Sequence, residues 1–81
     1  MTTNKQGDSV SLLLTRAEAL VLFEWLVRVD AAENLPIEDA AEQQVLWRLE
    51  GQLEKTLPEP LAPNYREAVE AARREVRGSQ E

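Results

Sequence analysis

The 81-residue sequence contains no cysteine and no histidine. Without cysteine there are no disulfides, thiol nucleophiles or zinc-thiolate sites, and small secreted domains often depend on disulfides. Without either residue, acyl-transfer triads and most acid–base machinery are difficult to build. A chain this short also has little room for a substrate pocket of roughly several hundred Å³ beside a core. We therefore predict a cytoplasmic protein with no enzymatic activity, no metal and no other cofactor.

Basic residues are also scarce, as are glycine and proline, which interrupt helices and strands. Fifteen acidic side chains against nine basic ones give a net charge of −6, which disfavours binding to phosphate backbones and anionic lipids. Only three glycines and four prolines accompany 43% apolar residues, a composition typical of globular chains. The longest apolar run, residues 17–29, is too short and too charged to span a bilayer, and residues 1–10 lack the apolar segment of a secretory signal. We expect protein partners, with no direct nucleic-acid or membrane binding.

The apolar run is predicted to form the central helix. Thr15 and Glu18 make a Thr-x-x-Glu capping box, which predicts a helix over 16–32. At 100° per residue, Glu24 and Arg28 lie on one narrow stripe with the spacing of an i,i+4 pair. Nearly all of the remaining circumference is apolar, so this helix needs cover on several sides.

Two further helices are predicted, over 40–56 and 65–77. Each starts with the same kind of capping box and carries an apolar stripe. Three prolines within 57–63 predict a stiff extended connector between them. The capping pairs are Asp39 with Glu42 and Asn64 with Glu67. The expected fold class is mainly α, with the second and third helices packed around the first.

A short N-terminal strand is predicted over residues 10–14. Val10, Leu12 and Leu14 alternate with other residues, so they point the same way in an extended chain. The strand partner is either the segment 35–37 or the same strand of a second subunit. The predicted organisation is a disordered tail over 1–8, a single helical domain over 9–78 and a frayed C-terminus over 79–81.

Four segments of the sequence together carry a resemblance to other proteins: residues 19–26, 41–43, 46–47 and 53–60. In this combination the chain resembles a group of small uncharacterised bacterial helical proteins. The similarity covers most of residues 11–76. It implies a bacterial, cytoplasmic origin and a compact helical fold. It supplies no activity, cofactor or functional residue.

The central helix also predicts a homodimer. Two amphipathic helices can cover only part of a helix that is apolar nearly all round, so the remaining face should meet a second subunit. The predicted dimer interface consists of Leu22, Trp25, Leu26 and Val29.

A second predicted contact surface combines Trp47 with acidic residues. Trp47 lies off the apolar ridge of its helix, so it either contacts another protein or packs under the connector over 57–63. Five acids without a basic residue, Asp30, Glu33, Glu38, Asp39 and Glu42, occupy thirteen positions. They either cap a solvated helix start or meet a basic partner, while the spacing of a calcium loop is lacking. The predicted partner contacts are Trp47, Glu38, Asp39 and Glu42.

The favoured function is a small non-catalytic protein–protein interaction module that forms a homodimer through its first helix. The alternative is an acidic inhibitor or antitoxin-like protein, including a nucleic-acid mimic, that occludes a basic site on its partner.

Overall fold

The computed structural model describes residues 9–32 and 36–78. Its elements are α1 (Arg16–Ala31), α2 (Ala40–Thr56), the 3₁₀-helix η1 (Glu59–Leu61) and α3 (Tyr65–Gly78). The predicted mainly α fold with three helices is confirmed, and each helix bound lies within one residue of its prediction. The predicted tail over 1–8 and the predicted frayed end over 79–81 lie outside the described residues.

The start of α1 is fixed by the predicted capping box. The backbone N–H of Glu18 donates to Thr15 Oγ1 at 3.0 Å, and the N–H of Thr15 donates to Glu18 Oε1 at 2.9 Å. Two backbone donors that lack an intrahelical partner are thereby satisfied reciprocally. The helix ends at Ala31, and the backbone of the following residue, Ala32, is extended.

The start of α2 follows the prediction with one difference. Asp39 Oδ1 accepts from the backbone N–H of Ala41 at 3.1 Å, as expected of an N-cap. The Glu42 carboxylate accepts from the N–H of Glu38 at 2.9 Å, one residue before the expected Asp39. The capping box predicted for α3 stays a prediction; there the carbonyl of Asn64 accepts from the N–H of Ala68 at 3.0 Å.

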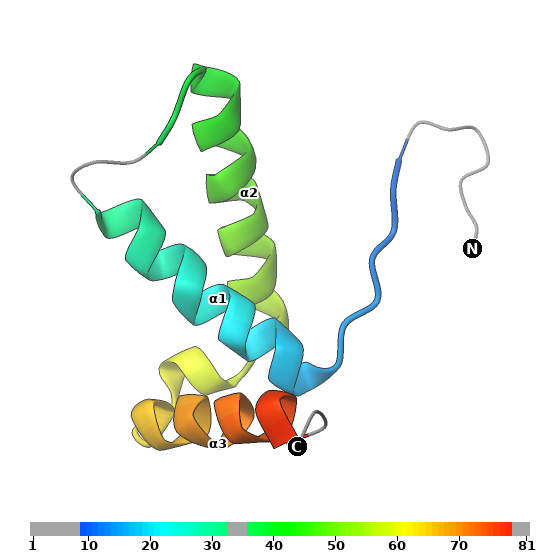
Figure 1. Ribbon diagram of the computed structural model, residues 1–81, viewed down its shortest axis with the longest axis vertical. Helices are drawn as coiled ribbons and strands as arrows, with labels where there is room; N and C mark the ends of the chain where they lie inside the picture. The colour runs from blue at the N-terminus through cyan, green and yellow to red at the C-terminus, as the bar shows by residue number, and fades with distance from the viewer. Residues whose placement is uncertain (1–8, 33–35, 79–81) are drawn as a thin grey trace.

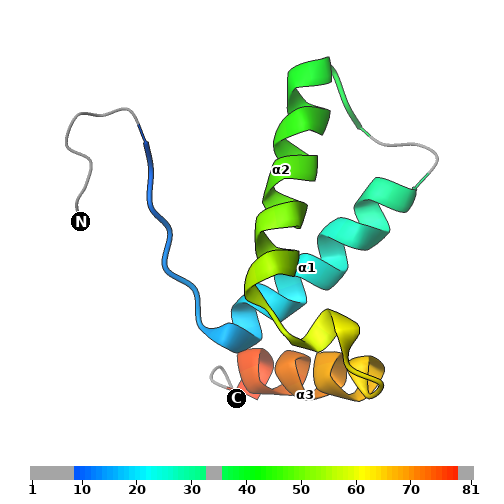
Figure 2. The same cartoon turned by 180° about the vertical axis from the view of Figure 1, so that it is seen from behind.

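The three helices enclose a small core around α1. Figure 1 shows α3 lying across the end of the α1–α2 pair, near the N-terminal half of α1. Both views show α1 and α2 diverging from that end toward the connection between them (Figures 1 and 2). The predicted arrangement of two helices around a central one is thus confirmed, with unequal cover on its two sides.

The core lies where α1, the end of α2 and α3 meet. Leu53 and Tyr65 pack against it while keeping some exposed surface, and Leu26 is buried outside it. Within α2 itself, no residue is fully buried. Burying one such apolar side chain contributes about 1.5–3 kcal/mol, so folding depends mainly on α1 and α3. The core cluster consists of Leu20, Phe23, Leu57, Val69 and Ala72.

The proline-rich connector is not extended throughout, which corrects the prediction. Its middle forms η1, because proline fits the first turn of a helix, where its missing N–H is not needed. Leu57 before η1 is buried, whereas Leu61 at its end is 88% exposed. Arg16 at the start of α1 pairs with Glu59 at 2.6 Å and ties η1 to the central helix.

The predicted strand over 10–14 is wrong for the single chain. Residues 9–15 have no regular secondary structure, and Figure 1 shows them leaving the helices in an extended course. A strand needs a partner for its backbone groups, and residues 36–37, the described part of the predicted partner, are irregular as well. Leu35 lies outside the described residues. We call residues 9–14 the N-terminal arm.

Candidate interaction surface

One side of α1 carries an exposed apolar face. Leu22, Trp25 and Val29 lie within about 60° of one another around the helix axis. Trp25 is 52% exposed, and Leu22 and Val29 are half-buried. Leu26, the fourth residue of the predicted interface, is only 5% exposed and belongs to the interior of the single chain. We call Leu22, Trp25 and Val29 the α1 face.

The cover that α2 provides for α1 is thin. Leu46 and Leu49 on α2 are half-buried, and Val45 is 63% exposed. A helix that supports a core normally buries a continuous apolar stripe. Here apolar surface remains open on both helices of the pair.

Trp47 joins α2 to α1 by its polar edge. Its Nε1 donates to Asp30 Oδ1 at 3.0 Å, and 52% of the residue stays exposed. A buried indole N–H usually finds an acceptor, and this bond satisfies it while much of the ring faces outward. The sequence alternatives for Trp47 did not include this acceptor on α1.

Acidic side chains gather at the α1–α2 contact and at the start of α2. Burial raises the pKa of Glu50, and the charge of Asp30, a hydrogen bond with Asp30 and the charge of Glu54 raise it further. Glu38, Asp39 and Glu42 are exposed at the N-terminus of α2. Within the described ranges, no ion pair reaches any of these acids; the pairs are Arg16–Glu59, Arg28–Glu24 and Arg73–Glu70. Glu33 lies outside the described residues.

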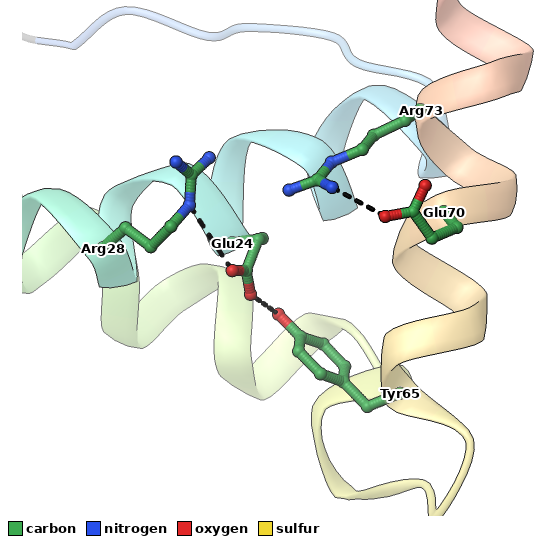
Figure 3. Close-up of polar contacts among 5 residues, drawn as sticks. All are labelled: Glu24, Arg28, Tyr65, Glu70 and Arg73. Carbon is green, nitrogen blue, oxygen red and sulfur yellow. Dashed lines mark hydrogen bonds and ion pairs between the residues drawn. The ribbon is translucent and has the colours of Figure 1, made fainter.

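A polar cluster fastens α1 to α3 (Figure 3). Tyr65 Oη donates to Glu24 Oε1 at 2.7 Å, and Arg28 Nε lies 3.5 Å from Glu24 Oε2, which confirms the predicted Glu24–Arg28 pair. Burial raises the pKa of Tyr65, as do the hydrogen bond and the negative charge of Glu24, although Arg73 acts in the opposite direction. The phenol therefore stays protonated and acts as a donor.

A small cavity beside this cluster measures about 170 Å³, below the roughly 300–1,000 Å³ of typical ligand sites. Arg73 on its wall is held by Glu70 at 2.8 Å. Both oxygens of Glu24 have partners, so the cluster acts as a clamp between helices. The cavity is lined by Glu24, Tyr65, Arg66, Val69, Glu70 and Arg73.

The sequence alone assigned no role to Tyr65, the first residue of the third predicted helix. The sequence signal for this contact was indirect: Glu24 is a carboxylate in the most apolar stretch of the chain, where a hydrogen-bond donor is to be expected beside it. In the described part of the chain, no group of three or more side chains could hold a metal ion. None of the helices described is long and apolar enough to cross a membrane.

Searches of protein-family models, curated proteins and solved structures found no match to this sequence. The proposed function therefore rests on the surfaces described above.

Proposed function

We propose that this chain is a non-catalytic cytoplasmic protein–protein interaction module that forms a homodimer through the α1 face. The observation that carries the proposal is the half-exposed Trp25 between two half-buried apolar residues of the same helix face. Tryptophan contributes a large contact area and is enriched among residues that dominate binding energy. Exposed in water, the α1 face is unfavourable, and burying it against a second copy removes that cost.

Charge favours the same arrangement. The chain carries a net charge of −6, so two copies repel one another over most of their surfaces. Leu22, Trp25 and Val29 are uncharged, and the ion-paired stripe of Glu24 and Arg28 lies elsewhere on the helix. The exposed Glu18 lies on the same side of α1, about one turn before Leu22. A contact through these three residues buries apolar surface and contributes no charge of its own.

Sedimentation equilibrium at micromolar concentration tests the proposal. We expect a concentration-dependent mass that approaches twice the 9.2 kDa chain. Trp25→Ala should weaken the dimer by roughly 30-fold or more, the loss of a binding hot spot worth about 2 kcal/mol. Trp47→Ala is the control, because it removes the same side chain at the same 52% exposure from α2. It also removes the bond to Asp30, so helical circular dichroism is measured for both variants.

Two results would count against the proposal. A mass of 9.2 kDa at every concentration would remove the homodimer. Equal weakening by Trp25→Ala and Trp47→Ala, with unchanged helical circular dichroism in both, would remove the α1 face as its interface.

The second candidate is an acidic inhibitor that occludes a basic site on a partner. It is favoured by Glu38, Asp39 and Glu42, which are exposed and, in the described structure, have no cationic partner. For a partner captured from the host, affinity for such an inhibitor should fall steeply from low to high salt. Affinity that is insensitive to salt would instead favour apolar docking.

A further inference from the structure

The N-terminal arm is extended and carries four apolar residues; residues 9–13 are exposed and Leu14 is half-buried. Val10 is 94% exposed, Leu12 77% and Leu13 97%. In Figures 1 and 2 the arm runs clear of the three helices in both views. The extended backbone at Thr15, which is fixed by the capping box of α1, sets its departure from the helix. Three large apolar side chains in water on one short segment call for a partner.

The arm also lacks the features that keep an exposed strand from pairing. Proteins protect strand edges with charged residues, proline and bulges. Residues 9–14 contain no charged residue, no proline and no glycine, which is the composition of segments that pair readily through their backbones. On a chain with a net charge of −6, this neutral segment can approach its own copy without electrostatic repulsion.

We propose that the arms of two copies pair as an antiparallel β-ribbon, with Leu12 opposite Leu12 of the second copy. This register is chosen by the pattern of apolar residues. A two-fold axis at Leu12 places Val10 opposite Leu14 of the other copy, so all three alternating residues of each arm share one face of the ribbon. No other two-fold register pairs Val10, Leu12 and Leu14 exclusively with one another.

The ribbon rests on the proposed homodimer, because an isolated two-stranded ribbon is only marginally stable in water. Each arm spans about 20 Å at the rise of an extended chain, which is too small a contact to hold two chains together alone. The α1 face supplies further apolar burial. The arms add backbone hydrogen bonds and fix the relative orientation of the copies.

Cysteine cross-linking tests the register directly, because the natural chain has no cysteine. In the proposed ribbon, the Leu12 Cα atoms of the two copies are about 4.5–5.5 Å apart, within the range of a disulfide. The two Leu13 Cα atoms are offset along the strands and about 8 Å apart, beyond that range. Under mild oxidation, Leu12→Cys should form disulfide dimers on the order of tenfold faster than Leu13→Cys.

The lysine variants Leu12→Lys and Leu61→Lys test the contribution of the ribbon to the dimer. Leu12→Lys places two like charges directly opposite one another in the ribbon. Leu61→Lys makes the same change at a leucine that is 88% exposed on η1. In sedimentation equilibrium of the full chain, we expect Leu12→Lys to raise the dimer Kd by about tenfold or more relative to Leu61→Lys.

The outcomes separate this inference from the proposed function. Equal cross-linking at positions 12 and 13, with equal Kd values for the two lysine variants, would overturn the ribbon while a dimer sensitive to Trp25→Ala stood. A wild-type chain that stays at 9.2 kDa would overturn both. Selective effects at Leu12 without any effect of Trp25→Ala would support the ribbon and overturn the α1 face.

Discussion

The two contacts made by α1 differ in kind. Toward α3, Leu20 and Phe23 pack with the buried residues Val69 and Ala72, and Tyr65 closes the contact through its bond to Glu24. Toward α2, Trp47 donates a hydrogen bond to Asp30, and α2 contributes no fully buried residue of its own. The side of α1 that faces α3 is buried in the core, whereas apolar surface stays exposed where α1 meets α2.

This difference suggests that residues important for folding and residues important for association lie on different sides of α1. Residues between α1 and α3 hold the single chain together, so changes there should affect folding first. Residues of the α1 face and of α2 contribute less to the core, so they are free to serve contacts with other molecules. The central helix α1 thus forms part of the core and also carries the proposed dimer interface.

The largest predicted effect compares one leucine on each side. Leu20 is 3% exposed in the core, whereas Leu46 on α2 is half-buried. Leu20→Ala should lower the free energy of unfolding by about 3 kcal/mol, because the loss of buried methyl groups leaves a cavity. Leu46→Ala should cost about 1 kcal/mol or less, because less surface is lost from contact. Urea unfolding followed by circular dichroism, at one protein concentration, measures both. Equal losses would contradict the difference between the two contacts.

A smaller effect is expected at the clamp between α1 and α3. Tyr65→Phe removes the donor to Glu24 and should cost about 1–2 kcal/mol, since the acceptor is charged. The pKa of Tyr65 is raised above its usual value of 10.0 in the folded chain. The unfolded chain therefore loses this proton first, so the stabilisation is complete below pH 10.0 and is lost as the pH rises above it. Unfolding measured from neutral to alkaline pH should show this fall in the wild type. An equal fall in Tyr65→Phe would contradict the assignment.

The smallest effect concerns the acids between α1 and α2. The pKa of Glu50 is raised above 4.5, so its favourable contribution is present below that pH and is lost as the pH rises through the folded-state pKa. Glu50→Gln removes repulsion from Asp30 and Glu54 and should stabilise the chain at pH 7 by about 0.5 kcal/mol. The advantage should disappear in mildly acidic buffer. Glu75→Gln, at an exposed site on α3, is the control; an equal gain there would show only a general effect of net charge.

The sequence predicted the helices well because their start signals are local. The reciprocal bonds of Thr15 and Glu18, and the cap at Asp39, involve residues at most three positions apart. The proline-rich connector was less predictable, because proline suits both an extended segment and the first turn of a 3₁₀-helix.

The strand and the site residues depend on contacts between distant parts of the chain. Alternation at Val10, Leu12 and Leu14 shows that the arm can form a strand, yet a strand also needs a neighbour, which the single chain does not supply. Periodicity likewise marked α1 as apolar nearly all round without showing which residues its neighbours would cover. Leu26 was therefore predicted at the surface and is buried, and Tyr65 was not linked to Glu24.

The bond from Tyr65 to Glu24 has a consequence for the speed of folding. It joins residues 41 positions apart, and the pair of Arg16 with Glu59 spans 43. Single helices form within about a microsecond, but contacts at this separation must first close a long loop against chain entropy. We expect loop closure to limit the folding rate, with α3 docking on α1 in that step. Refolding should then slow when the segment between α2 and α3 is lengthened.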